Sequence, residues 1–271
     1  MSPAQPQTWH YGLMARWWAE FNVAEPEELA YYRAAIERFG QPALDLGCGA
    51  GRILVPLLAQ GLAVDGVDLS ADMLAQTARL AAAQGLSPTL TAQAMHEFDL
   101  PRHYRTIYIC DSFGIGGSRA NDRLTLRRVH DQLEPGGALV FSHYLPYEGH
   151  DAESWARWLP GNRGPLPQPW PTEWERRKAT DGDELELQTR RADFDPLLQS
   201  MTLEMRIRLW RNGSVIDQDE HPLIENLYFL QELLLMLDDA GFRDVAVEGW
   251  YTGLPASTDD ARVVMVGRRP A

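Results

Sequence analysis

The stretch ALDLGCGAGRILVPL, residues 43–57, limits the possible folds more than any other part of the chain. A short apolar run leads into three glycines, Gly47, Gly49 and Gly51, and a helix-like segment follows them. Glycine adopts positive φ angles easily and lets a ligand touch the backbone where a Cβ atom would clash. The first N–H groups of the following helix are unpaired and carry partial positive charge. The stretch therefore predicts a strand, a tight turn and a helix that together bind a ligand against the backbone.

Strand and helix patterns alternate along the next hundred residues. Ser70 is a good cap for a helix over 71–84, and Asn121 is expected to cap another. Five short apolar runs predict strands at 42–47, 62–70, 89–95, 105–111 and 138–144. Such alternation is typical of a parallel sheet with helices on both faces.

The regions outside this alternating core have different sequence patterns. Apolar spacing predicts two N-terminal helices within a cap over residues 1–40, with Pro26 opening the second. Residues 184–221 alternate apolar with polar side chains, and Asn212-Gly213 is a strong hairpin signal. A final helix and two closing strands follow. We therefore predict one domain over residues 1–271, with an antiparallel meander inside an insertion at 146–224.

Composition excludes several classes of protein. The net charge of −13 and the pI near 4.9 would repel a phosphate backbone, so nucleic acid is not the expected partner. No apolar run approaches the roughly 20 residues that cross a bilayer, and no basic, apolar leader begins the chain. A cytoplasmic protein without a membrane partner is expected. Cys48, Cys110 and the seven histidines show no zinc-like spacing, so no metal is expected.

The glycine spacing separates two classes of ligand. Dinucleotide sites usually read GxGxxG, whereas this turn reads GxGxG. Asp68 ends the second predicted strand, 17 residues after Gly51, where its carboxylate can accept both hydroxyls of an adenosine ribose.

Together, LDLGCGAGR and VDGVDLSADML resemble the opening motifs of class I S-adenosylmethionine-dependent methyltransferases. The resemblance covers residues 40–145 and 225–268 and implies a Rossmann-like, seven-stranded, mostly parallel sheet. It also implies S-adenosylmethionine as cofactor and S-adenosylhomocysteine as product. Asp45 would support the turn and hold the methionine ammonium group through water, and Asp68 would hold the ribose. The implied cofactor site comprises Asp45, Gly47, Cys48, Gly49, Gly51, Arg52, Asp68, Leu69, Met73, Gln93, Ala94, Met95 and Ser112.

One position departs from the family pattern. Many relatives carry an acid after the third strand that binds the adenine amino group, but Ala94 stands there in this chain. Gln93 or His96 is then the candidate acceptor of that hydrogen bond, and the backbone N–H of Met95 can meet adenine N1.

The methyl acceptor is expected to be a small molecule. The Asp/Asn-Pro-Pro-aromatic and Pro-Cys signatures of DNA-modifying relatives are missing from the sequence. We predict His143 as the general base because its ordinary pKa is near neutrality, with Asp111 and Tyr11 as further catalytic candidates. The other expected pocket residues are Tyr144, Tyr147 and Glu148.

The insertion leaves alternatives open. The tryptophans at 155, 158, 170 and 174 either cover the acceptor or fasten their own loop, and the meander either roofs the site or forms a homodimer face. A non-catalytic binding protein of the same fold is the alternative function. An NAD-dependent oxidoreductase fits the fold but not the glycine spacing.

Overall fold

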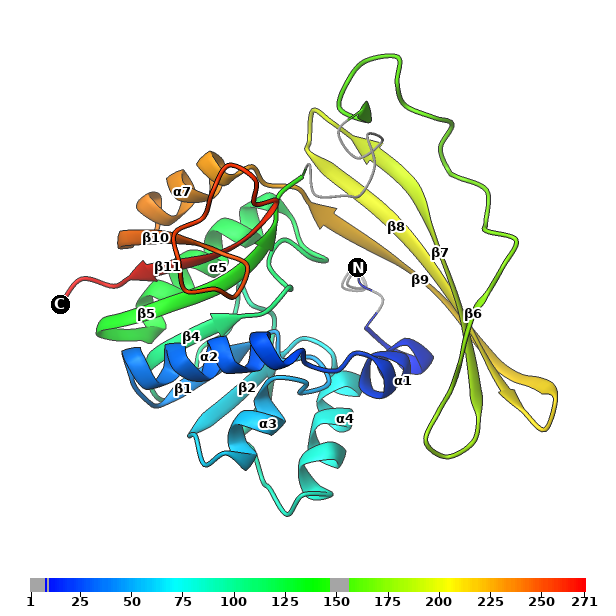
Figure 1. Ribbon diagram of the computed structural model, residues 1–271, viewed down its shortest axis with the longest axis horizontal. Helices are drawn as coiled ribbons and strands as arrows, with labels where there is room; N and C mark the ends of the chain where they lie inside the picture. Colours follow the sequence, from blue (N-terminus) through cyan, green and yellow to red (C-terminus); the bar gives the residue numbers. More distant parts are fainter. Residues whose placement is uncertain (1–7, 9, 147–155) are drawn as a thin grey trace, which may run out of the picture.

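The computed structural model describes residue 8 and residues 10–146 and 156–271, and they form two β-sheets (Figure 1). The larger sheet has seven strands in the order β10-β11-β5-β4-β1-β2-β3. Neighbours among β1 to β5 pair in parallel, whereas β11 runs antiparallel to both β5 and β10. The strands are β1 (Ala43–Leu46), β2 (Val64–Asp68), β3 (Leu90–Ala92), β4 (Tyr104–Ile109), β5 (Leu133–Tyr144), β10 (Arg243–Gly249) and β11 (Arg262–Arg268). The predicted seven-stranded, mostly parallel sheet is confirmed.

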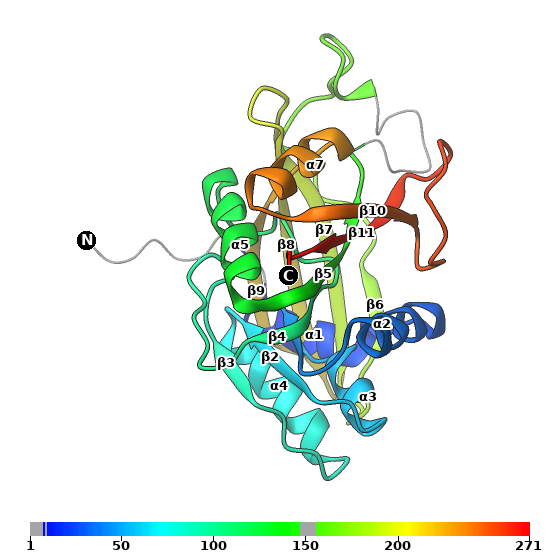
Figure 2. The ribbon, with the colours of Figure 1, turned by 90° about the vertical axis from the view of Figure 1, so that its left-hand side faces the viewer.

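Helices cover both faces of this sheet, as predicted. One face packs against α2 (Pro26–Phe39), α3 (Leu54–Ala59) and α4 (Ala71–Ala82). The other packs against α5 (Arg119–Gln132) and α7 (Leu230–Asp239). Figure 2 looks along the sheet and shows α5 on one side and α2 and α3 on the other. Because both faces are buried, the central strand β1 is apolar except for Asp45.

The second sheet follows β5 in the chain and precedes α7. Its antiparallel strands run in the order β6-β7-β8-β9. They are β6 (Glu175–Lys178), β7 (Glu184–Asp195), β8 (Ser200–Arg211) and β9 (Ser214–Asn226). Helix α1 (Gly12–Phe21) buries Leu13, Met14 and Trp17 against the inner face of this sheet. Periodicity missed β6 because its four residues, ERRK, are all exposed and carry no apolar alternation.

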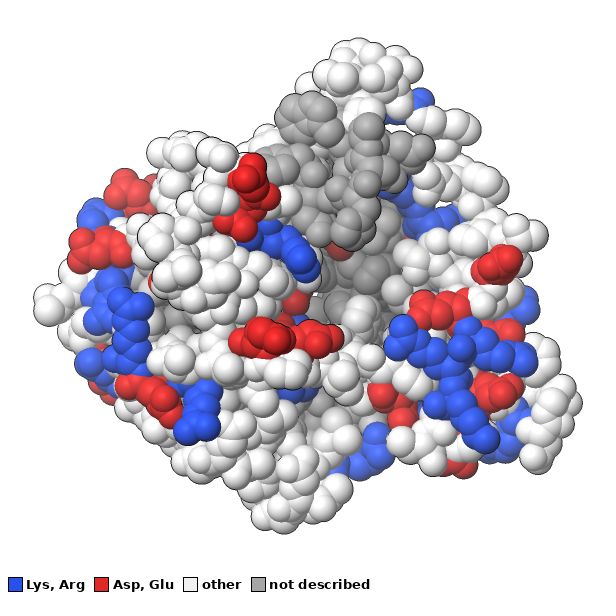
Figure 3. Space-filling model, viewed as in Figure 1, with Lys and Arg blue, Asp and Glu red and all other residues white. Residues whose placement is uncertain are grey.

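The outer face of the second sheet carries mixed charges, visible over β6 to β9 in Figure 3. Two of the loop tryptophans lie on it. The Trp170 ring centroid is 4.4 Å from the guanidinium carbon of Arg190 and 4.3 Å from that of Arg206. Trp174 stacks similarly on Arg206 and Arg208. These rings fasten their own segment to the sheet, whereas position 155 lies outside the described residues.

Two element boundaries differ from the expectations. Ser118, not Asn121, caps α5, because the Asn121 N–H donates to the Ser118 Oγ at 3.2 Å. Strand β3 ends at Ala92, so the chain leaves the sheet before Ala94 and Met95. Among the described residues, no helix is long and apolar enough to cross a bilayer.

Candidate active site

A cavity of about 1480 Å³ lies between the carboxyl ends of β1, β2 and β4 and the last residues of β9. Open α/β sheets bind their ligands at this edge. We call the lining residues within 45–53, 68–73, 94–97 and 110–112 the glycine-turn half. We call those within 114–125, 198–200 and 223–226 the β9 half. Thr8, His10, Trp18, Asn22 and Tyr144 complete the lining.

The three glycines of the turn all have positive φ, but for different reasons. A Cβ atom at Gly47 would lie 2.3 Å from the Met95 Cε and 2.4 Å from the Ser112 Oγ, so the cavity wall closes on this backbone. At Gly51 it would lie 2.7 Å from the Thr77 Cγ2, on α4. Gly47 and Gly49 line the cavity and Gly51 does not. The structure therefore corrects the expectation for Gly51, which permits packing between the turn and α4.

Asp68 joins the end of β2 to the glycine turn. Its Oδ2 accepts the Gly49 N–H and its Oδ1 accepts the Ser70 N–H, both at 2.8 Å. Each carboxylate oxygen can accept a further hydrogen bond. Burial raises the pKa of Asp68, and these backbone donors oppose the rise. The carboxylate is thus held in place at the cavity wall with capacity left for the hydroxyls of a ligand.

Asp45, in the centre of β1, is only 2% exposed and lines the cavity. Its Oδ1 has no hydrogen-bond partner among the described residues. Burial raises the pKa of this carboxyl to about 8, while the nearby Tyr108 hydroxyl and the charge of Arg52 oppose the rise. A buried acceptor without a partner is costly unless a ligand supplies a donor. A cationic donor at this point would both complete the hydrogen bonding and restore the carboxylate charge.

The glycine-turn half fits S-adenosylmethionine. Asp45 would receive the ammonium group of its methionine part, directly or through water, and Asp68 the ribose hydroxyls. The cofactor would supply a methyl group on a positively charged sulfur. The other predicted cofactor residues that line the cavity are Gly47, Cys48, Gly49, Arg52, Leu69, Met73, Ala94, Met95 and Ser112.

Gln93 does not join the predicted set. Its Oε1 accepts the Asp99 N–H at 3.1 Å, and Gln93 does not line the cavity. His96, the other residue considered for the adenine amino group, does line it. The structure therefore favours His96 and the Met95 backbone over Gln93 at this end.

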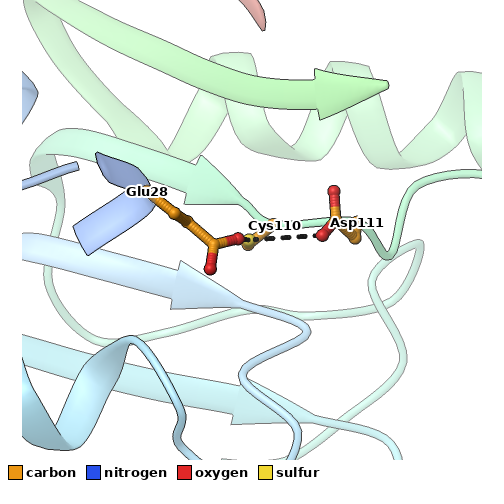
Figure 4. A group of neighbouring side chains, drawn as sticks. All are labelled: Glu28, Cys110 and Asp111. Atoms are coloured by element: carbon orange, nitrogen blue, oxygen red, sulfur yellow. Dashed lines mark hydrogen bonds between the residues drawn. The ribbon is translucent and has the colours of Figure 1, made fainter. Parts of the chain in front are cut away.

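A charged network links the glycine turn to α2 and β4. The Arg52 guanidinium donates to Glu28, which is 3% exposed, and at 2.8 Å to the Asp111 Oδ2. The Cys110 Sγ lies 3.0 Å from the Glu28 Oε1 (Figure 4). Glu28, Cys110 and Asp111 form a group compact enough for a metal ion. Arg52 already bridges the two carboxylates, so its charge stabilises them without an ion.

Asp111 lines the cavity where β4 ends. Its Oδ1 accepts a 2.6 Å hydrogen bond from the Ser142 hydroxyl, and its backbone has a positive φ of 54°. Burial raises the pKa of Asp111, while Ser142 and Arg52 oppose the rise. A carboxylate fixed on two sides can position a ligand, and the catalytic role of Asp111 stays a prediction.

The other two predicted catalytic residues are not brought to the cavity wall. His143 is buried on β5 beside Val263 of β11, and its Nε2 lies 3.2 Å from the Tyr228 carbonyl oxygen. Burial lowers its pKa to about 4. Because His143 is absent from the lining, the structure argues against it as the base. Tyr11 precedes α1, and its pKa is raised by burial and by the charges of Asp68 and Asp72.

Sequence reasoning missed most of the β9 half. Glu225 and Leu223 lie on the inner side of β9, and Ile115 pairs with Glu225 through the backbone. The useful signal was the parity of β9, because Leu223 and Glu225 are two residues apart and so share a face. Tyr144 lines the cavity as expected, whereas positions 147 and 148 lie outside the described residues.

Comparisons with known proteins identify the fold and the domain. Residues 43–137 match the family described as "Methyltransferase domain". A protein of Geobacillus sp. strain WCH70 named as a methyltransferase is 28% identical over 51% of this chain and 59% of its own length. The chain thus spans only part of that relative.

Two solved structures resemble nearly the whole chain. A Clostridium acetobutylicum S-adenosylmethionine-dependent methyltransferase aligns with TM-score 0.71 and 16% identity, covering 96% of this chain and 98% of that one. A sugar N-methyltransferase of Streptoalloteichus sp. aligns with TM-score 0.68 and 18% identity, covering 100% and 99%. At these identities the likeness concerns the fold.

The comparisons support a coarser statement. Residues 43–137 match a methyltransferase domain, and the fold of the chain is that of S-adenosylmethionine-dependent methyltransferases.

Proposed function

We propose that the protein is an enzyme that transfers a methyl group from S-adenosylmethionine to a nitrogen or oxygen atom of a small molecule. The observation that carries the proposal is the pair of carboxylates at the glycine turn. Asp68 is fixed by two backbone N–H groups, and Asp45 has a buried oxygen without a partner. These groups match the ribose hydroxyls and the ammonium group of one ligand.

The remaining space supports a small acceptor. About 1480 Å³ exceeds the few hundred cubic ångströms that one compact ligand fills, so cofactor and acceptor can be bound together. The named activity of the Streptoalloteichus neighbour, a sugar N-methyltransferase, supports nitrogen as the receiving atom.

Methyl transfer from a sulfonium is an in-line displacement, so the protein mainly has to align the acceptor and remove its proton. Arg52 and Ser142 hold Asp111 at the wall next to Ser112, so a fixed carboxylate lies within the glycine-turn half, where we propose that the cofactor binds. The β9 half then orients the acceptor and excludes water.

Calorimetric titration with S-adenosylhomocysteine tests the proposal. Wild-type protein is expected to bind it, and Asp68→Asn to weaken binding by about 2 kcal/mol, roughly 30-fold, because charge-assisted hydrogen bonds are lost. Asp65→Asn is the matched control, since Asp65 lies on the same strand but faces Tyr104 and Arg102. Absence of wild-type binding, or equal affinities for all three proteins, would refute the assignment.

A further inference from the structure

The carboxylates that line the cavity differ in whether they have hydrogen-bond or ion-pair partners. Among the described residues, six line it: Asp45, Asp68, Glu97, Asp111, Asp122 and Glu225. Asp122, for example, accepts the Tyr228 hydroxyl at 2.6 Å and the Asn226 amide at 2.7 Å. Hydrogen bonds or ion pairs also engage Asp68, Asp111 and Glu97. Within the described part of the chain, only the Asp45 Oδ1 and the Glu225 carboxylate lack such a partner.

Backbone hydrogen bonds connect the end of β9, which carries Glu225, to the loop that follows β4. The Gly116 N–H donates to the Ile224 carbonyl at 2.7 Å, and the Asn226 N–H donates to the Gly114 carbonyl at 2.8 Å. Ile115 pairs with Glu225 between these two bonds. The loop 114–117 begins two residues after Ser112, so β9 is tied to the segment that follows β4. Glu225, which lines the cavity, is therefore held on a strand end that is hydrogen-bonded to the loop after β4.

The β9 half, which contains Glu225, is lined by both polar and apolar side chains, the polar ones including Ser200 and Asn226. Ile115, Leu198 and Leu223 line the same half of the cavity. Burial raises the pKa of Glu225, and the positive charge of Arg157 opposes the rise. In the described lining, two arginines occur, and both have other partners: Arg52 pairs with Glu28 and Asp111, and Arg119 pairs with Glu232. A cation brought by a ligand would stabilise this carboxylate.

We propose that Glu225 binds the methyl acceptor through a primary or secondary ammonium group, so that the acceptor is an amine. This inference rests on the proposed methyl transfer and specifies its substrate class. It also gives the inserted sheet a defined task, since β9 supplies the specificity-determining carboxylate.

The same carboxylate acts as the base that removes the proton of the acceptor's ammonium group. Glu225 takes a proton from the ammonium nitrogen, which frees an electron pair on that nitrogen. The pair forms the new N–C bond to the transferred methyl group, while the S–C bond breaks and its electrons remain on sulfur. The product leaves as an N-methylated ammonium ion, and Glu225 returns its proton to water.

Sinefungin tests the geometry without knowledge of the acceptor. In this cofactor analogue a carbon bearing an ammonium group replaces the methylsulfonium, so the charge points at the acceptor. We expect Glu225→Gln to weaken sinefungin binding about tenfold and to leave S-adenosylhomocysteine binding unchanged. Glu220→Gln is the control, because Glu220 is an exposed carboxylate on the same strand and outside the cavity. Equal loss of both ligands, or no loss of sinefungin, overturns the proposal.

A substrate panel tests the acceptor class. Amines are each paired with the alcohol of the same carbon skeleton, and S-adenosylhomocysteine release is measured with wild-type protein and with Glu225→Gln. Turnover of amines that falls at least tenfold in the variant supports the inference. Turnover of alcohols alone, or amine turnover equal in both proteins, overturns it while the methyl-transfer proposal stands. Failure of wild-type protein to bind S-adenosylhomocysteine refutes the proposed function instead.

Discussion

The two halves of the cavity are built from different kinds of sequence. The glycine-turn half is made by short loops that directly follow β1, β2, β3 and β4, so each group lies within a few residues of a strand end. The β9 half joins residues about a hundred positions apart, such as Ile115 and Glu225. The first half is local and repeats the features of many methyltransferases, whereas the second depends on an insertion. Cofactor binding and acceptor choice can therefore change independently.

The largest expected effect on ligand affinity comes from a substitution of Asp45. The same substitution should weaken ligand binding and yet make the ligand-free protein more stable. Asp45→Asn removes the carboxylate that we propose to bind the cofactor ammonium group, and S-adenosylhomocysteine affinity should fall about 100-fold, or about 3 kcal/mol. The ligand-free variant should nevertheless melt at a higher temperature than wild type at pH 8, because no charge has to be buried.

The pH dependence of this gain has a defined sign. In the folded protein the pKa of Asp45 is raised from 3.8 to about 8. The unfolded chain thus releases its proton near pH 4, whereas the folded one holds it until about pH 8, and wild-type stability falls as pH rises between these values. We expect the Tm advantage of Asp45→Asn to grow from pH 5 to pH 8, reaching about 10 °C. A constant difference in scanning calorimetry would contradict the buried carboxyl.

A second substitution, at Gly51, tests whether every glycine of the turn is needed for ligand binding. Gly51→Ala places a methyl group against Thr77 at a φ of +82°, so unfolding free energy should fall by about 2 kcal/mol. S-adenosylhomocysteine affinity should stay within about threefold of wild type, since Gly51 does not line the cavity. Gly61→Ala measures the backbone strain alone, because its φ is +85° and no atom lies within 4 Å of the added Cβ. Equal losses in the two variants would mean that the Thr77 contact is unimportant.

The fold was predictable because its signals are local. Alternating strands and helices, the Ser70 cap and the Asn212-Gly213 hairpin each act within a few residues. Asp45 and Asp68 were predictable as cavity residues for the same reason, since each lies in or at the end of a strand beside the turn. Strand β6 and the Ser118 cap were missed, because an exposed ERRK strand has no apolar pattern and two neighbouring polar residues can cap a helix equally well.

The catalytic candidates show where sequence reasoning stops. His143 has the right chemistry and lies at the end of a central strand, but the pairing of β5 with β11 and the Tyr228 contact bury it. No local sequence pattern distinguishes Glu225 from the other acidic residues of this chain. Its importance depends on the pairing of β9 with the loop after β4, a contact between residues 110 positions apart that no local pattern encodes.

The smallest expected loss of stability comes from the outer face of the second sheet. Substitutions there test whether that sheet affects cofactor binding in the glycine-turn half. Trp170→Ala removes the ring between Arg190 and Arg206, so unfolding free energy should fall by about 1 kcal/mol and Tm by about 3 °C. Arg206→Lys keeps the charge but loses the planar stack and should give a smaller loss. Affinity for S-adenosylhomocysteine should be unchanged in both, since these residues lie outside the cavity. If either variant weakened cofactor binding, the two halves would be coupled through the sheet, and the separation of cofactor binding from acceptor choice would be wrong.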